Sequence, residues 1–266
     1  MSSALFNDPG AVTFTYECYA SLLETLADHG YTAASFDEGI TDGEVLLRHD
    51  VDLSPRKALM IGQIEANHGF SSTYFFLVTT PLYNVMDQAV RNVLAALVDL
   101  GHNVGLHFDS HQYWQTIPNE QSLQSHISED RTIIDIAAPS ATDAFSFHCP
   151  PEWALNATFK GVRHTYEPAY FSEIAYAADS GQRWRTSAVL DGSLPDRLQL
   201  LTHPGLWGPT DAPYVQRVTS EIAAHVDRTE LYLTRQLLED EFPPVDFPYR
   251  DIMPVPSART VFPPDS

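Results

Sequence analysis

Two histidines four residues apart, His107 and His111, are the residues of this sequence best suited to chemistry. They follow a short apolar segment, and their spacing allows both imidazoles to turn to one side and share a metal ion. A tetrahedral catalytic zinc site takes three protein ligands and leaves one position open for water. The pair therefore predicts a metal site whose third ligand lies elsewhere, with Asp109 as an alternative oxygen ligand.

Two carboxylates, Asp50 and Asp52, end another apolar segment. Residues two apart on an extended strand point the same way, so both would face one pocket. Their mutual repulsion is costly unless a cation lies beside them. One can then bind the metal while the other handles protons. The alternative is that Asp52 belongs only to the turn before the next helix. The preceding Arg48 and His49 are more typical of structural or supporting positions.

Two further histidines close apolar segments. His148 is followed by Cys149, Pro150 and a second proline, which would aim its imidazole rigidly. Cys149 lacks an evident partner and is a poor candidate nucleophile. His203 precedes another proline, and an imidazole there can act as general acid toward a leaving amine. Each histidine has a plain structural alternative, which for His148 is the cap of a buried turn.

A loop rich in functional groups lies between these histidines. Asp179 could orient a catalytic histidine, Trp184 could line a sugar site, and Arg185 adds a cation. A plain surface loop explains the same residues equally well. The loop therefore contributes candidates for substrate binding or support, and Trp207 is a second candidate for an aromatic sugar platform.

The elements that must position these groups alternate along the chain. Apolar periodicity and stop signals predict helices over 13–29, 54–69, 87–100, 121–137 and 212–241, and strands over 44–52, 72–78, 103–107, 144–148 and 198–203. Strands alternating with helices are typical of βαβ units in a parallel sheet. The candidate residues stand at the C-terminal ends of strands, where α/β architectures assemble their sites. We therefore expect them to converge on one edge of the sheet.

The bulk composition narrows the class of protein. The 266 residues favour one domain over 1–266, with a core at about 44–242 and a Pro-rich tail at 243–266. The formal charge is −20, from 35 acidic against 15 basic residues, which repels nucleic acids and anionic membranes. We therefore expect no nucleic-acid partner. The composition does not predict whether the protein is a monomer or an oligomer.

The expected compartment follows from what the sequence lacks. Two cysteines are too few for a disulfide framework. The N-terminal segment has neither the basic nor the long apolar region of a secretory signal. No run of about 18 apolar residues suggests a membrane span. A cytoplasmic enzyme is the expectation.

The ordered motifs resemble those of the polysaccharide deacetylase family, the NodB-homology or carbohydrate esterase family 4 domains. Asp50-Val51-Asp52 resembles the family's first motif, the segment from Gly101 to His111 the second, and Leu200 to Pro204 the last. The segment His148-Cys149-Pro150-Pro151 stands in place of the third motif. The second motif is specific, and the others gain weight from their order. The resemblance covers about residues 45–208.

The resemblance implies an α/β fold, a distorted (β/α) barrel with about seven parallel strands. It implies that Asp52, His107 and His111 hold a divalent metal, usually zinc. Asp50 would be the general base and His203 the general acid of a metal-dependent hydrolase. The implied reaction removes an N-acetyl group from an acetylated amino sugar or glycan precursor.

Two departures from the family pattern bear on activity. Phe108 replaces the usual Ser or Thr, and His148 replaces an arginine that orients the catalytic aspartate. An imidazole lacks the bidentate fork of a guanidinium. The chain thus resembles a divergent branch acting on a sugar precursor. Two alternatives stay open: a metallo-amidohydrolase acting on a non-sugar acyl amide, expected if the cavity lacks the tryptophan platform, and a non-catalytic carbohydrate-binding relative.

Overall fold

The structure, a computed structural model, describes residues 4–138, 140–190 and 192–234. It separates into two compact units, residues 1–222 and 223–266, with the sheet and the candidate site residues in the first. The expectation of one domain over 1–266 stays a prediction. The tail expected at 243–266 lies outside the described residues.

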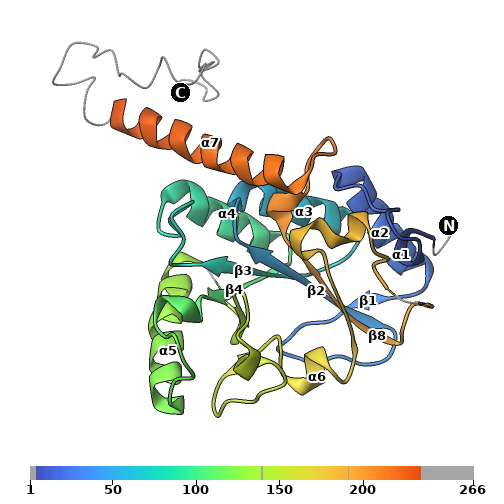
Figure 1. Cartoon of the computed structure of the whole chain (residues 1–266), viewed down its shortest axis with the longest axis horizontal. Coiled ribbons are helices and arrows are strands. Elements are labelled where there is room, and N and C mark those ends of the chain that lie inside the picture. The colour runs from blue at the N-terminus through green and yellow to red at the C-terminus, as the bar shows by residue number, and fades with distance from the viewer. Residues whose placement is uncertain (1–3, 139, 191, 235–266) are drawn as a thin grey trace. The chain divides into compact units, whose positions relative to one another are not determined.

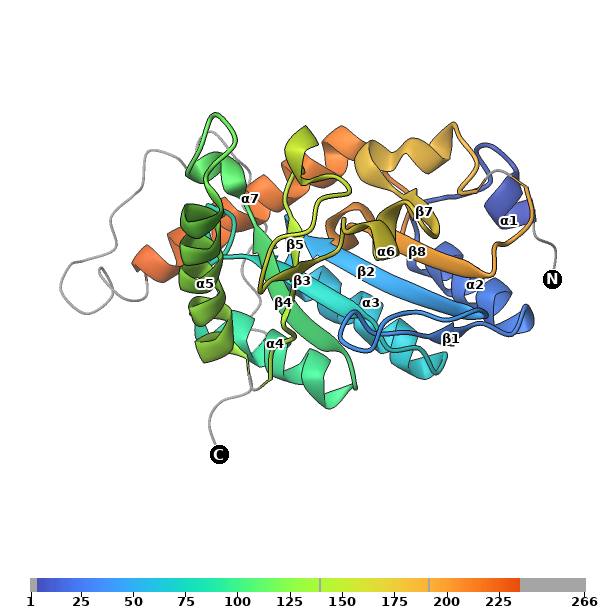
Figure 2. The ribbon, with the colours of Figure 1, turned by 90° about the horizontal axis from the view of Figure 1, so that it is seen from below.

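A single parallel sheet forms the centre of the first unit (Figures 1 and 2). Its strands are β1 (Thr32–Ala33), β2 (Glu44–Val51), β3 (Thr73–Leu77), β4 (Asn103–Phe108), β5 (Ala144–Phe147), β6 (Arg163–His164), β7 (Ala175–Ala178) and β8 (Arg197–Thr202). Seven of them run in the order β6-β5-β4-β3-β2-β8-β7, and β1 pairs with β2. Within the described residues, the end strands β6 and β7 do not pair, so the curled sheet stays open. This confirms the predicted distorted (β/α) barrel with about seven parallel strands.

Helices follow most of the strands. They are α1 (Ala4–Asn7), α2 (Tyr16–Asp28), α3 (Pro55–Asn67), α4 (Gln88–Asp99), α5 (Glu120–Ala137), α6 (Pro168–Phe171) and α7 (Tyr214–Leu233), with short 3-10 turns η1 (Ser110–Gln112), η2 (Glu152–Ala154), η3 (Ser180–Arg185) and η4 (Pro204–Leu206). Helix α3 packs between α2 and α4 on one face of the sheet (Figure 1). The division between the two units falls inside α7.

The sequence patterns located the long elements closely, because their periodicity and end signals are strong. Thr15 caps α2 by accepting a hydrogen bond from the backbone of Cys18. Pro55 opens α3, and Gly69 after that helix has a φ of +77°, which favours glycine. The strands β1, β6 and β7 were not predicted; β1 and β6 have two residues each, which is too short for a periodic pattern. Residues 235–241 of the predicted closing helix lie outside the described part.

Strand β2 is the strand that positions most of the site. Every residue from Val45 to Val51 is buried, as expected for a parallel strand covered on both faces. Alternation sends Arg48 and Asp50 to one face and His49 to the other. The strand ends of β2, β4, β5 and β8 then bring their following residues to one edge. Among the described residues, no helix is long and apolar enough to cross a membrane.

Candidate active site

A cavity of about 230 Å³ lies at the C-terminal edge of the sheet. Its lining includes the strand-end candidates Asp50, Asp52, His107, His148 and His203. They come from β2, β4 and the segments that follow β2, β5 and β8. The expected convergence of strand-end groups on one rim therefore occurs.

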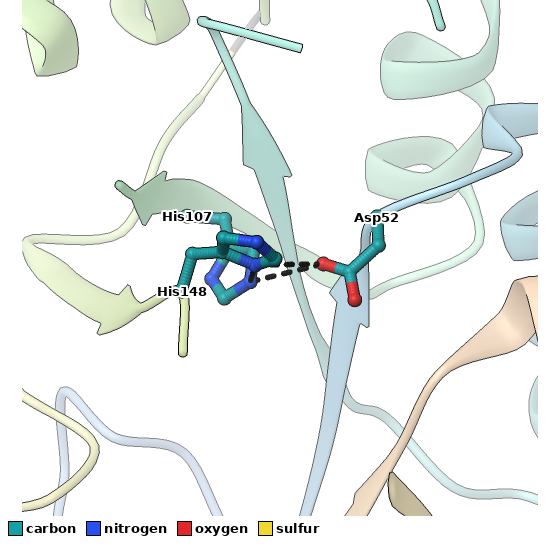
Figure 3. Close-up of side chains that lie close together, drawn as sticks. All are labelled: Asp52, His107 and His148. Atoms are coloured by element: carbon teal, nitrogen blue, oxygen red, sulfur yellow. Dashed lines mark hydrogen bonds and ion pairs between the residues drawn. The ribbon is translucent and has the colours of Figure 1, made fainter. Parts of the chain in front are cut away.

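Three ligand atoms meet in this cavity (Figure 3). Asp52 Oδ1 lies 3.1 Å from His107 Nε2 and 3.3 Å from His148 Nδ1. The two imidazole nitrogens are themselves 3.2 Å apart. Zinc bonds of about 2.0–2.1 Å at tetrahedral angles would place neighbouring ligand atoms about 3.3–3.4 Å apart. The triangle formed by these three side chains matches that spacing.

The surroundings of these atoms also suit a metal. Asp52 Oδ1 is buried and makes no hydrogen bond of normal geometry, although the two imidazoles lie beside it. His107 Nδ1 lies 3.2 Å from the backbone carbonyl of Ser146, which accepts its proton and leaves Nε2 free to bind. One carboxylate and two imidazoles form a donor set that zinc and similar divalent metals accept. These residues therefore fit a single metal ion.

His111, expected as a metal ligand, is placed elsewhere. Its side chain is 53% exposed, and its Nδ1 lies 3.3 Å from Asp109 Oδ1. Strand β4 ends at Phe108 and the chain turns into η1, so the i, i+4 relation with His107 does not bring the rings to one side. His148 lies beside Asp52 and His107 instead. The sequence had indicated a rigidly aimed imidazole there, but not its direction.

The charges of Asp52, His107 and His148 depend on each other. Burial lowers the pKa of His148, but the contacts with Asp52 and with Cys149 together outweigh burial and raise this pKa to about 11. Burial would raise the pKa of Asp52, yet the neighbouring imidazoles of His107, His148 and His203 together hold it well below its usual range. A proton and a metal thus compete for His148 Nδ1, so metal binding would release a proton.

Asp50 is buried beside this cluster and faces the cavity. Arg48 donates to both of its oxygens, from Nε to Oδ1 at 3.0 Å and from Nη2 to Oδ2 at 2.7 Å. Burial would raise the pKa of Asp50, but the charge and hydrogen bonds of Arg48, together with His107 and His203, outweigh burial and lower the pKa. The segment after β5 carries His148 in place of the family's arginine, and the guanidinium that contacts this carboxylate comes from Arg48 of β2. His107 Nε2 lies 3.8 Å from Asp50 Oδ2.

His203 forms a dyad with Asp179. Its Nδ1 lies 2.6 Å from Asp179 Oδ1, and Trp207 Nε1 donates to Oδ2 of the same buried carboxylate at 2.8 Å. Burial lowers the pKa of His203, but Asp179 outweighs it and raises this pKa to about 9. His203 Nε2 lies on the side of Asp52, 3.8 Å from its Oδ2 atom. The possibility that Asp179 orients a histidine agrees with this geometry.

The two tryptophans expected to form an aromatic platform for a sugar do not line the cavity. Trp184 is 1% exposed and packs edge-to-face on Trp207, which is completely buried, and neither lines the cavity. Pro150 does line it. Of the aromatic side chains that line the cavity, Phe147 and Tyr166 are buried and Tyr214 is 46% exposed. Tyr214 was not predicted, because the start of a helix carries no sign of the direction of its side chain.

Two other candidate positions serve the fold. Arg185 forms a bidentate pair with Asp211 and lies outside the cavity lining. Phe108 is completely buried and stacks on Tyr113 at 5.7 Å between ring centroids. Phe108 points to the face of the sheet opposite His107, so its aromatic ring lies away from Asp52, His107 and His148.

Comparisons with known proteins give a structural resemblance only. No protein-family model and no curated protein matches the chain. A carbohydrate esterase family 4 (CE4) pseudoenzyme from Bacillus anthracis aligns at 13% identity over 69% of this chain and 60% of its own, with a TM-score of 0.37. This chain therefore spans about three fifths of that protein.

Two further structures match larger shares of their own chains. An acetyl xylan esterase from Clostridium thermocellum aligns at 16% identity, 73% and 92% coverage and a TM-score of 0.39. A CE4 esterase from Streptococcus mutans aligns at 13% identity, 81% and 89% coverage and a TM-score of 0.41. The structure thus resembles CE4 proteins distantly.

Proposed function

We propose that this chain is a metal-dependent hydrolase that removes the N-acetyl group from an acetylated amino sugar. The observation that carries the proposal is the triangle of ligand atoms formed by Asp52, His107 and His148, with sides of 3.1–3.3 Å. Asp50 and His203 line the same cavity, so a base and an acid accompany the candidate metal site.

Asp52, His107 and His148 would hold the metal, with zinc favoured by the mixed carboxylate and imidazole set. His148 replaces His111 in this proposal because His111 faces Asp109 and solvent. When bound, the metal would polarise the acyl carbonyl and activate water.

Asp50 and His203 divide the proton chemistry. Asp50 is held ionised by Arg48, so it can accept a proton from the attacking water. His203 has a pKa of about 9 and therefore carries a proton at neutral pH. Asp179 holds its Nδ1, which leaves the Nε2 proton for the departing nitrogen. The two groups begin the reaction in the protonation states that amide hydrolysis requires.

The cavity limits the substrate. Its volume of about 230 Å³ is below the roughly 300–1,000 Å³ of pockets that enclose drug-sized ligands. It suits an acyl group and part of one sugar ring. The cytoplasmic location stays a prediction.

A second candidate is favoured by one observation. The tryptophans expected as a sugar platform are buried away from the cavity, which is the feature expected of a metallo-amidohydrolase acting on a non-sugar acyl amide. The catalytic groups would be the same for both substrates. A screen of acetylated sugars against simple N-acyl amides separates the two candidates.

Release of acetate from nucleotide-linked, lipid-linked and oligomeric acetylated amino sugars tests the proposal. We expect release by the metal-loaded protein and its loss on chelation or with Asp50→Asn. A metal-loaded protein that is inert toward all of these sugars would contradict sugar deacetylation. Sugar affinity without turnover, unchanged by Asp50→Asn, would identify a non-catalytic carbohydrate-binding protein.

A further inference from the structure

Arg48 is a completely buried cation beside the reaction cavity. Its Nε and Nη2 atoms contact the two oxygens of Asp50 at 3.0 and 2.7 Å, which is a side-on bidentate pair. Such a fork fixes the plane of a carboxylate as well as its position. A lysine ammonium, which is a point charge on a flexible stem, would supply the charge without fixing the plane.

The guanidinium is itself held on several sides. Nη2 also contacts Ser146 Oγ at 2.6 Å and Tyr166 Oη at 2.9 Å, and Nη1 donates to Gln199 Oε1 at 3.2 Å. The ring of Tyr166 lies 4.4 Å from the guanidinium carbon. These partners come from β5, β8 and the segment after β6, so three parts of the sheet fix one side chain.

Asp50 has a further restraint on the same side. Ser146 Oγ lies 3.0 Å from Asp50 Oδ1, so this hydroxyl bridges the carboxylate and the guanidinium. Both Asp50 oxygens thus have partners at the base of the cavity, and the carboxylate has no freedom to rotate without breaking a contact. The same carboxylate lines the cavity, with Oδ2 at 3.8 Å from His107 Nε2.

We propose that Arg48 is the positioning residue of Asp50, and that its fork aims one carboxylate lone pair at the place where the attacking water lies. The inference rests on the proposed function for the identity of that water. It extends the function by assigning the orientation of the base to strand β2 itself. Two residues of one strand, on one face, would then act as a unit.

A purely structural role for Arg48 makes a different prediction. If the guanidinium only neutralised a buried carboxylate, any cation that reaches Asp50 would serve. Arg48→Lys keeps the charge and removes the fork, so it separates the two roles. Arg217→Lys is the matched control, because Arg217 is also buried, donates to backbone oxygens of Phe14 and Thr210, and lies outside the cavity lining.

Steady-state kinetics, metal binding and a crystal structure of each variant form the test. For Arg48→Lys we expect kcat to fall on the order of 100-fold, as for a misplacement of about 1 Å, with KM within about twofold. We expect metal affinity to stay unchanged and the Asp50 carboxylate to rotate in the crystal structure. Arg217→Lys should leave kcat, metal affinity and Asp50 unchanged.

The outcomes are distinguishable from a failure of the proposed function. If the wild-type protein turns over no substrate, the hydrolase proposal fails, and the position of Asp50 in the Arg48→Lys structure still decides this inference. An unmoved Asp50 carboxylate in the Arg48→Lys variant would overturn the positioning role. Wild-type kcat in that variant would overturn it as well.

Discussion

Glu65 of α3 is a carboxylate with no exposure to solvent. Its Oε1 accepts from Tyr19 Oη at 2.5 Å and contacts His49 Nε2 at 2.7 Å, and its Oε2 accepts from Ser72 Oγ and Tyr74 Oη, both at 2.6 Å. Burial would raise the pKa of Glu65, but His49 and the other partners outweigh burial and lower this pKa from 4.5 to about 2. The ionised form is therefore the form that the folded protein stabilises.

The size of the effect follows from that difference. A folded-state pKa of about 2 against 4.5 in the unfolded chain corresponds to about 3 kcal/mol of stability at neutral pH. Because the folded pKa is lowered, this stability is present above pH 4.5 and is lost as the pH falls toward 2. Between pH 7 and pH 3 the loss would be about 2 kcal/mol.

Glu65→Gln keeps the shape of the side chain and removes its charge. We expect the variant to be less stable than wild type by about 3 kcal/mol at pH 7, since breaking a buried charged pair typically costs about that much. The gap should narrow by about 2 kcal/mol at pH 3, because only the wild type loses this contribution there. Urea unfolding at both pH values measures the gap, with exposed Glu173→Gln as the control.

A constant gap between pH 7 and pH 3 would refute the reasoning, because the charge of Glu65 would then not be the source of the stability.

The hydrogen-bond network of Glu65 also extends to the candidate active site. His49 lies next to Asp50 in β2, and its Nδ1 contacts Thr202 Oγ1 at 2.7 Å, directly before His203. We therefore expect Glu65→Gln to lower turnover slightly as well as to lower the stability.

Other substitutions test the acid, the mouth and the wall of the cavity. Asp179→Asn should lower the pKa of His203 from about 9, because burial then dominates, so the alkaline limit of activity should move to lower pH; an NMR titration of the imidazole checks this, and an unchanged pKa would contradict it. Tyr214→Ala should raise KM several-fold for sugar substrates and leave kcat unchanged if this ring stacks on the sugar, whereas an unchanged KM in steady-state assays would remove that role. Gly205→Ala would place a Cβ 2.7 Å from Leu53 Cβ, so thermal unfolding should show a loss of about 1–3 kcal/mol, and wild-type stability would show that Leu53 moves freely.

The sequence was sufficient to predict the architecture because the long elements carry strong signals. The predicted strand over 44–52 and the predicted helix over 54–69 differ from the observed elements by no more than two residues at either end. Their alternation with further strands predicts a parallel sheet, and parallel strands place their C-terminal residues together. Convergence of Asp50, His148 and His203 therefore needed no side-chain information.

Side-chain direction could not be predicted in the same way. The spacing of His107 and His111 is meaningful only if the intervening chain is regular, and here a strand ends between them and a 3-10 turn begins. Trp184 could equally line a pocket or fill a core, and the structure buries it. The pairing of Arg48 with Asp50 depends on a shared strand face, which a period-two pattern could have suggested.

The identity of the metal ligands is the claim on which the account depends most. Calorimetric titration and elemental analysis of wild type, His148→Ala and His111→Ala test it directly, with zinc as the probe. We predict one zinc per wild-type chain, an affinity at least about 100-fold weaker for His148→Ala, and wild-type affinity for His111→Ala. Loss of zinc in His111→Ala with full affinity in His148→Ala would contradict the account.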